Sequence, residues 1–133
     1  MLFLLDTDTC SYAIRNASST LDARLATAKP DSLAISAITR AELMFGVEKR
    51  GNPLALTRLV RSFLDRFAVM PWDAQAADHF AQLRALLERG GTPIGTFDTM
   101  IAGHALALKA TLVTNNLKHF QKVKALKLEN WLD

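Results

Sequence analysis

The order of the apolar segments limits how this chain can fold more than any other feature. Four short apolar runs have the length of buried β-strands, and they cover residues 2–5, 33–36, 67–70 and 111–114. Longer stretches with helical periodicity follow most of them, and a helical crossover is the usual connection between parallel strands. The alternation therefore predicts an α/β fold with a mainly parallel sheet and helices on both faces.

Helical periodicity is clearest in three stretches. In the first, apolar residues recur at i, i+3, i+4, i+7, i+8 and i+11 from Leu56, which is the stripe of an amphipathic helix. The second runs from Asp73 until Gly90 stops it. The third covers residues 97–108, directly after the glycine-rich stretch GGTPIGTFD. We expect a helix in each.

The chain has the length of one ordinary domain, with 133 residues of which 50% are hydrophobic. We therefore expect a single domain over residues 1–133 with one hydrophobic core. Asp6 ends the apolar start too early for a signal peptide, and no run approaches the roughly 18 residues of a membrane span. Cys10 is the only cysteine, so no internal disulfide can form. A cytoplasmic protein without membrane association is expected.

Positive charge exceeds negative charge, because 16 Lys and Arg stand against 13 Asp and Glu and give a net charge of +3. Basic residues also cluster, with four lysines and no acid between Lys118 and Lys127. Such a balance favours association with polyanions such as nucleic acids. A solvated basic face is the structural alternative for any one cluster.

Three acids occupy positions at which an α/β sheet forms its ligand site. Asp6 ends the first apolar run, Glu42 lies one turn into the helix expected after the second, and Asp98 begins the helix after the glycine-rich stretch. Ligands of open α/β sheets bind beyond the carboxyl ends of the strands. Converging carboxylates repel one another unless they share a cation, and oxygen-only ligands select Mg²⁺ or Mn²⁺. The sequence therefore indicates a metal site.

Each acid also has a structural interpretation. Asp6 can cap the following helix by accepting hydrogen bonds from its first free backbone N–H groups. Thr39 and Glu42 have the T-x-x-E spacing of a capping box. Asp98 would be stabilised in a first helical turn by the helix macrodipole. The recurrence of acids at three sheet-end positions in a basic protein is what favours the metal site.

The three histidines offer no comparable pattern. No pair has the i, i+4 spacing of metal ligands on a helix. We expect His79 and His119 to be exposed, and His104 to be a hydrogen-bonded, half-buried residue beside apolar neighbours on its helix. A histidine metal site is therefore not predicted.

Four segments carry a resemblance to a known family, in the same order along the chain. They are LLDTDTC (4–10), ISAITRAELMFG (35–46), GTPIGTFDTMIAGHAL (91–106) and LVTNNLKHF (112–120). Together they resemble the successive motifs of PIN-domain ribonucleases, specifically the VapC toxins of bacterial VapBC toxin–antitoxin pairs. The resemblance implies a compact three-layer α/β/α PIN-like domain and a Mg²⁺- or Mn²⁺-dependent endoribonuclease acting on structured RNA such as tRNA. It also implies a VapB-type antitoxin and a homodimer.

The resemblance assigns roles to individual residues. Asp6, Glu42 and Asp98 match the catalytic, metal-binding acids. Many relatives carry a fourth acid where this chain has Asn116, which offers an oxygen but no charge, so a second ion should bind less tightly. Thr7 and Thr114 match hydroxyl positions that support the site. The other supporting candidates are Asp8, which can compensate for the missing acid or cap the helix, Thr39 and Asn115.

Acids repel RNA, so basic residues outside the acid cluster must hold the phosphate backbone. The candidates are Arg84, Arg89, Lys118 and Lys122. The structural alternative for each is an ordinary exposed, solvated side chain.

Two other functions stay open on the sequence. DTDTC differs only at Cys10 from the D-x-D-x-T/V motif of haloacid-dehalogenase phosphatases, in which Asp6 would be the nucleophile. The segment TNN, however, supplies no late acidic pair for such an enzyme. Asn116 would instead suit an inactive PIN-like module that binds RNA through its basic face. Retention of three acids that are costly without a metal argues against that module.

Overall fold

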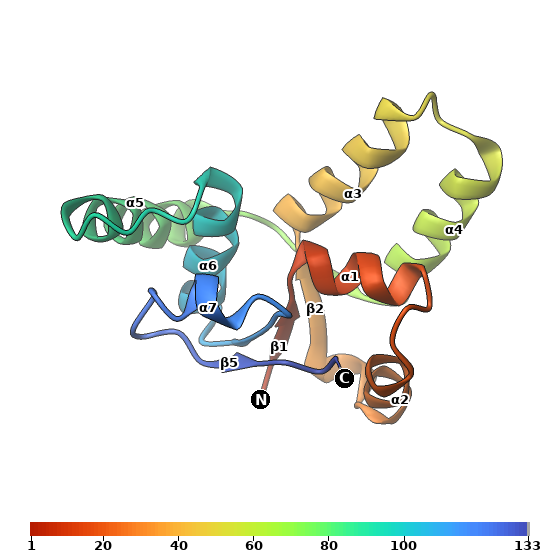
Figure 1. Cartoon of the computed structure of the whole chain (residues 1–133), viewed down its shortest axis with the longest axis horizontal. Helices are drawn as coiled ribbons and strands as arrows, with labels where there is room; N and C mark the ends of the chain where they lie inside the picture. Colours follow the sequence, from red (N-terminus) through yellow and green to blue (C-terminus); the bar gives the residue numbers. More distant parts are fainter. Residues whose placement is uncertain (133) are drawn as a thin grey trace.

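A computed structural model describes residues 1–132 (Figure 1). Two α-helices follow each of the first three strands, one follows the fourth, and a 3₁₀ helix lies at Pro30–Ser32. In order, the elements are β1 (Phe3–Leu5), α1 (Thr7–Ile14), α2 (Ser19–Thr27), β2 (Leu33–Ser36), α3 (Ala37–Lys49), α4 (Leu54–Leu64), β3 (Ala68–Met70), α5 (Ala74–Arg89), α6 (Thr96–Leu108), β4 (Thr111–Val113), α7 (Leu117–Phe120) and β5 (Leu128–Glu129).

The strands form one sheet in the order β3-β2-β1-β4-β5, and all neighbouring strands are parallel. The central strand β1 pairs Leu4 with Ala34 of β2 on one side and with Leu112 of β4 on the other. The chain proceeds outward from β1 to β3 and then returns to the opposite side of β1 for β4. The ends of β1 and β4 therefore flank the switch point at which open α/β sheets bind ligands. The predicted parallel α/β fold is confirmed.

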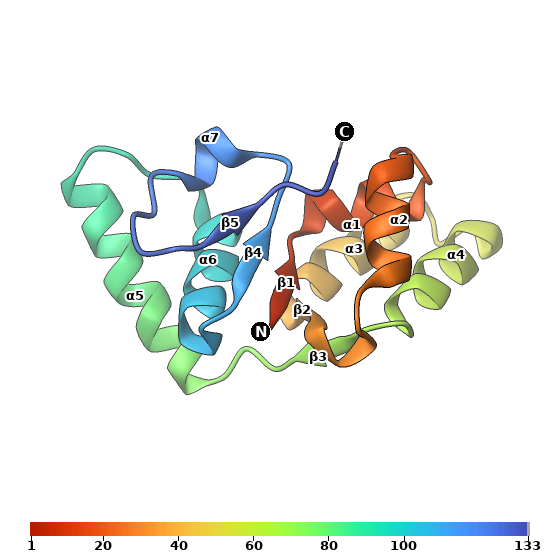
Figure 2. The same ribbon diagram turned by 90° about the horizontal axis from the view of Figure 1, so that it is seen from below.

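Helices cover both faces of the sheet (Figure 2). Successive strand residues point to opposite faces, so Leu5 and Leu4 enter different hydrophobic clusters. The Leu5 cluster contains side chains of α1, α2, α3 and α4, whereas the Leu4 cluster contains side chains of α5 and α6. The three-layer α/β/α arrangement is confirmed, and the sheet divides the core into two clusters where one core was expected.

Close packing of α5 against α6 fixes the position of the residues that α6 carries. A Cβ atom on Gly103 would lie only 2.8 Å from the backbone nitrogen of Phe80. Glycine is therefore needed at this crossing, because the backbone of α5 occupies the space of a side chain. The close contact of the two helices fixes α6, whose first turn contains Asp98, against α5.

The predicted strands and helices are present with small shifts at their ends. The helix expected from Leu56 begins at Leu54, and the strand expected over residues 67–70 begins at Ala68. Within residues 1–132, no expectation covered α2, the 3₁₀ helix, α7 or β5, whereas α1 is the helix that Asp6 was considered to cap. Within residues 1–132, no helix is both long and apolar enough to cross a bilayer.

Candidate active site

Asp6 lies at the carboxyl end of the central strand and is buried, with 3% of its surface exposed. It caps α1, because its Oδ1 accepts a hydrogen bond from the Thr9 backbone N–H at 2.8 Å. Its carboxylate is also hydrogen-bonded by the side chain of Thr114. Burial raises the pKa of Asp6 from 3.8 to about 6, and the hydrogen bonds from Thr114 and Thr9 oppose part of that rise. The capping interpretation is confirmed, and the cap stands at the switch point of the sheet.

Glu42 takes no part in a capping box, so that interpretation is wrong. The N-cap of α3 is Ser36, whose Oγ accepts a hydrogen bond from the Ile38 backbone N–H at 3.1 Å. Thr39 consequently lies inside the first turn of the helix, and it is fully buried. Glu42 sits one turn further on, where no free backbone N–H group is left to bind it.

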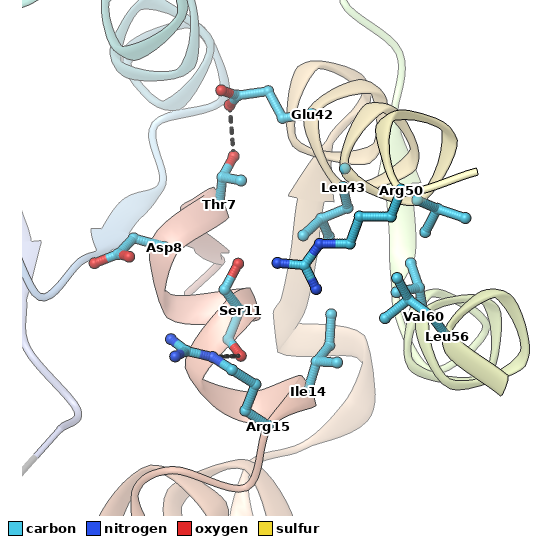
Figure 3. A pocket seen from close by; sticks show the side chains of 12 residues that line it. Thr7, Asp8, Ser11, Ile14, Arg15, Glu42, Leu43, Arg50, Leu56 and Val60 are labelled. Atoms are coloured by element: carbon cyan, nitrogen blue, oxygen red, sulfur yellow. Dashed lines mark hydrogen bonds between the residues drawn. The ribbon is translucent and has the colours of Figure 1, made fainter. Parts of the chain in front are cut away.

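A hydroxyl group from α1 holds Glu42 instead. The Thr7 hydroxyl donates to Oε1 of Glu42 at 2.7 Å (Figure 3). Thr7 has only one hydroxyl proton, so the Thr39 hydroxyl, 3.1 Å away, is left to donate to Thr7. Burial raises the pKa of Glu42, the hydrogen bond from Thr7 lowers it, and the negative charge of Asp98 raises it further.

Asp98 lies in the first turn of α6, as predicted, and its side chain is half-buried. Its Oδ2 is 2.9 Å from Nε2 of His119, which belongs to α7. Burial raises the pKa of Asp98, His119 lowers it through its charge and its hydrogen bond, and Asp8 raises it. The carboxylate therefore has an imidazole partner that the sequence did not indicate.

The four acids Asp6, Asp8, Glu42 and Asp98, here called the acid crevice, act on one another. Asp98 raises the pKa of Glu42, and Asp8 raises the pKa values of Asp6 and Asp98. Within residues 1–132, no Lys or Arg forms an ion pair with any of them. In the same part of the chain, no group of three or more His, Cys, Asp and Glu side chains is arranged to hold a metal ion. The donor chemistry still suits a hard divalent cation, which would relieve the repulsion.

The segment after β4 contributes one side chain to the acid crevice. Thr114 is buried and reaches Asp6, while its Oγ1 also accepts a hydrogen bond from the Asn116 backbone N–H at 2.9 Å. Asn115 is exposed, and its Oδ1 accepts a hydrogen bond from Asn130 at 3.4 Å. Asn116 is exposed at the start of α7. Of these supporting positions, Thr114 is thus the one in contact with a catalytic candidate.

A groove of about 420 Å³ opens beside the acid crevice, between α1, α3 and α4 (Figure 3). Thr7, Asp8 and Glu42 form its polar end, so the groove and the acid crevice are continuous. Two arginines line it as well, Arg15 and Arg50. Its apolar lining consists of Ile14, Leu43, Val47, Leu56 and Val60.

Comparison with known proteins assigns the family. The PIN domain family matches residues 3–126. The tRNA(fMet)-specific endonuclease VapC of Salmonella typhimurium is 40% identical over 129 residues, which cover 97% of each chain. Ribonuclease VapC2 of Rickettsia felis is 39% identical over 132 residues, which cover 98% of each chain. The chain belongs to the VapC group of PIN-domain ribonucleases.

Solved VapC structures share the whole fold. The chain superposes with a TM-score of 0.92 on the DNA-bound VapBC complex of Salmonella typhimurium, at 41% identity and over 98% of this chain and 99% of that one. For VapBC2 of Rickettsia felis bound to a promoter DNA fragment, the TM-score is 0.91 at 37% identity, with the same coverage. VapC membership confirms the resemblance and decides against a haloacid-dehalogenase phosphatase.

The basic residues predicted to contact RNA differ in whether their side chains already have partners within the chain. The Nε of Arg84 lies 3.3 Å from Glu88, and its guanidinium stands over the ring of Phe80, so Arg84 already has two partners. Arg84 is exposed, as are the other three candidates, Arg89, Lys118 and Lys122.

Two arginines near the acids were missed by the sequence reasoning. Arg15 and Arg50 line the groove, and Figure 3 shows the Arg50 side chain extending from the end of α3 toward α1. Arg50 belongs to a basic stretch of the sequence, but nothing local distinguishes it from its neighbours there. Only the packing of α1 against α3 identifies both residues.

The histidine predictions are partly wrong. His79 and His119 are half-buried rather than exposed. His104 is hydrogen-bonded as predicted, with Nδ1 2.8 Å from Oγ of Ser36, but it is fully buried at 1% exposure. His119 is the functional neighbour that the sequence reasoning missed. No local spacing in the sequence marks it, because its contact with Asp98 joins two separate helices, α7 and α6.

Proposed function

We propose that this chain is an endoribonuclease that requires Mg²⁺ or Mn²⁺ and cleaves structured RNA such as tRNA. The observation that carries the proposal is the acid crevice, in which Asp6, Glu42 and Asp98 come from three separate elements and have raised pKa values. Such a cluster is costly unless a cation is bound. The choice of tRNA is supported by the Salmonella typhimurium relative, which is named a tRNA(fMet)-specific endonuclease.

In this proposal, Asp6, Glu42 and Asp98 hold the ion. A bound ion of this kind lowers the pKa of a water molecule and neutralises charge on the phosphate oxygens. The chain itself fixes the ligands: Thr9 and Thr114 orient Asp6, and the Thr7 hydroxyl orients Glu42.

Exposed basic residues outside the acid crevice bind the phosphates of the RNA. Those proposed are Arg89, Lys118 and Lys122. These side chains offset the repulsion between RNA and the acids. The affinity of the chain for RNA should therefore fall as the salt concentration rises.

The experiment is cleavage of tRNA by the purified chain with Mg²⁺ and with EDTA. The expected products carry 5′-phosphate and 3′-hydroxyl ends, and EDTA abolishes their formation. Asp6→Asn should be inactive, while Asp65→Asn, which changes an exposed acid at the end of α4, should cleave like the parent. Binding of tRNA without cleavage by the parent in Mg²⁺ would favour the inactive RNA-binding module.

We also infer that a VapB-type antitoxin neutralises the chain by occupying the groove. Similar solved structures are VapBC complexes. The apolar lining suits the apolar face of a partner helix, and the acidic end at Asp8 and Glu42 suits an Arg or Lys of the partner.

Two expression experiments test the antitoxin. The chain should be toxic when expressed alone and harmless with its antitoxin. Leu56→Glu, in the groove, should weaken antitoxin binding, whereas Leu86→Glu, on exposed α5 surface, should not. Harmless expression of the folded, active chain without any partner would contradict this part of the proposal.

We further propose that the chain is a single PIN domain that works in the cytoplasm, where its RNA substrates are, as a homodimer. Light scattering of the purified chain tests the homodimer. It should give about twice the chain mass of 14.7 kDa.

A further inference from the structure

His119 connects α7 to Asp98 of the acid crevice and to the loop before α6. From α7, its Nε2 lies 2.9 Å from Oδ2 of Asp98 and 2.7 Å from the carbonyl oxygen of Ile94. Ile94 directly precedes Gly95, the N-cap of α6. The imidazole also packs edge-on against Phe120, with ring centroids 5.4 Å apart. One ring therefore ties α7 to the loop before α6 and to the carboxylate of Asp98.

The two contacts of His119 Nε2 show which ring nitrogen is protonated. A carbonyl oxygen and a carboxylate oxygen are both acceptors, so Nε2 must be the donor, shared between them. This holds for the neutral imidazole and for the imidazolium alike. The Nε2–H group is hydrogen-bonded to the carbonyl oxygen of Ile94 and lies at ion-pair distance from Oδ2 of Asp98, so Oδ1 is the oxygen that remains for a cation.

The position of Asp98 depends on a single side-chain partner, His119, and Asp98 is more exposed to solvent than Asp6. Asp6 is buried and is bonded by Thr9 and Thr114, and Glu42 is bonded by Thr7. Within residues 1–132, His119 is the only side chain bonded to Asp98, which is half-buried at the surface. Without that bond, the carboxylate would be free to rotate into the solvent.

We propose that His119 is a positioning residue that holds the Asp98 carboxylate in the orientation needed for cation binding and RNA cleavage. The inference rests on the proposed function, since that assigns Asp98 to the metal site. Partners that orient metal ligands in this way typically change metal affinity or activity by about 10–100-fold when they are removed.

Three substitutions separate positioning from packing. His119→Gln keeps an N–H donor near the place of Nε2 and removes the aromatic ring. His119→Phe keeps a ring that can pack against Phe120 and removes the donor. The matched control is His79→Phe on α5, where His79 contacts the carbonyl oxygen of Gln75 in its own helix.

The primary measurement is Mn²⁺ binding to each full-length protein by calorimetry, with thermal unfolding as the check of the fold. We expect His119→Phe to bind Mn²⁺ about 10-fold more weakly than the parent, and His119→Gln to retain most of the affinity. His79→Phe should bind like the parent. The Mg²⁺ concentration for half-maximal tRNA cleavage should shift in the same order.

Nitrogen NMR of the metal-free parent gives a second readout that needs no variant. The His119 ring should be protonated at Nε2. A neutral ring protonated only at Nδ1 would overturn the proposal, and so would parental Mn²⁺ affinity in a folded His119→Phe protein. If His119→Phe does not fold, His119→Gln decides, because a 10-fold loss there would also overturn it. A parent that neither binds Mn²⁺ nor cleaves tRNA would instead refute the proposed function.

Discussion

Asp6 and Asp98 belong to the same acid crevice, but the chain holds them in different ways. Asp6 follows the central strand, is 3% exposed, and is bonded by the Thr9 N–H and by Thr114. Asp98 lies on the first turn of α6 with 39% of its side chain exposed, and its bonded side chain is the imidazole of His119. Neutral donors of the interior hold the first acid, and a ring from a short surface helix holds the second.

This comparison shows that the free-energy cost of burying a carboxylate and the positioning of a carboxylate fall on different acids. Removing a carboxylate from water costs free energy, and burial accordingly raises the pKa of Asp6 to about 6. Asp98 also has a raised pKa, but His119 opposes that rise and solvent reaches the side chain. Asp6 is thus the acid that most destabilises the metal-free fold, and Asp98 is the one that relies most on a neighbour.

The largest expected effect on tRNA cleavage comes from neutralising one of the three metal-binding candidates. Asp6→Asn, Asp98→Asn and Glu42→Gln should each lower tRNA cleavage by more than about 100-fold, beyond the loss caused by removing an outer partner. Asp6→Asn should also stabilise the metal-free chain by at most about 3 kcal/mol, since a rise in pKa from 3.8 to about 6 corresponds to that free energy. Asn keeps the N-cap of α1, because it is as good a cap as Asp.

Urea unfolding in EDTA measures this contrast. The gain in unfolding free energy should be clearly larger for Asp6→Asn than for Asp98→Asn, whose charge is partly solvated. Equal gains would show that the two acids do not differ as described. If these variants cleaved tRNA at the parental rate, the proposed metal site would be wrong.

The pH dependence of stability sharpens the same contrast. The pKa of Asp6 is about 6 in the folded chain and near 3.8 when unfolded, so the folded state binds the proton more readily. The destabilisation is therefore complete above pH 6 and is relieved as the pH falls toward 4. The stability difference between Asp6→Asn and the parent should shrink from pH 7.5 to pH 5 in EDTA. A constant difference over that range would contradict the buried charge.

The long helices were predicted from their apolar period, and the strands β1 to β4 from short apolar runs. The α5 stretch runs through 16 residues, Ala74–Arg89, and that length displays its apolar face. By contrast, α7 covers Leu117–Phe120 and β5 covers Leu128–Glu129, which is too short for any period to appear. The unpredicted α7 is the helix that carries His119, so the missed element and the missed residue have one cause.

The acids of the site could be predicted from the sequence, whereas their partners could not. Ser36 and Thr39 are both good N-cap residues, and only the end of β2 at Ser36 decides between them. The bond from Thr7 to Glu42 joins residues 35 positions apart, and the contact of His119 with Asp98 joins two helices. Such pairs are created by the fold, and local spacing carries no record of them.

Removal of the Thr7 hydroxyl tests whether Glu42, like Asp98, needs a hydrogen-bonding neighbour to hold its position. Thr7→Val should lower cleavage by about 10-fold, because Glu42 loses the hydroxyl that orients it. Thr57→Val is the matched control, since Thr57 of α4 donates a similar bond to the side chain of Asn52, outside the acid crevice. Cleavage rates at saturating Mg²⁺ measure the effect. Equal rates for the two variants would mean that Glu42 needs no such support.

Asn116→Asp tests whether the crevice has room for a further charged ligand, and it has the smallest expected effect. Asn116 is exposed and donates its backbone N–H to Thr114, which bonds Asp6, so we expect a carboxylate at this position to add negative charge next to the Asp6 side of the crevice. One added charge near a cation in a water-like dielectric contributes about 1 kcal/mol, which lowers the Mg²⁺ concentration for half-maximal cleavage about 5-fold.

Asn115→Asp is the control for Asn116→Asp, because Asn115 faces Asn130 and adds the same charge without joining Asp6. If a second ion contributes to the reaction, only Asn116→Asp should ease the Mg²⁺ requirement. If one ion suffices, either carboxylate mainly repels RNA phosphate, and cleavage slows or stays unchanged. We favour the second ion, because two ions stabilise both the attacking and the leaving oxygen. A Mg²⁺ titration with an unchanged or higher midpoint for Asn116→Asp would decide for a single ion.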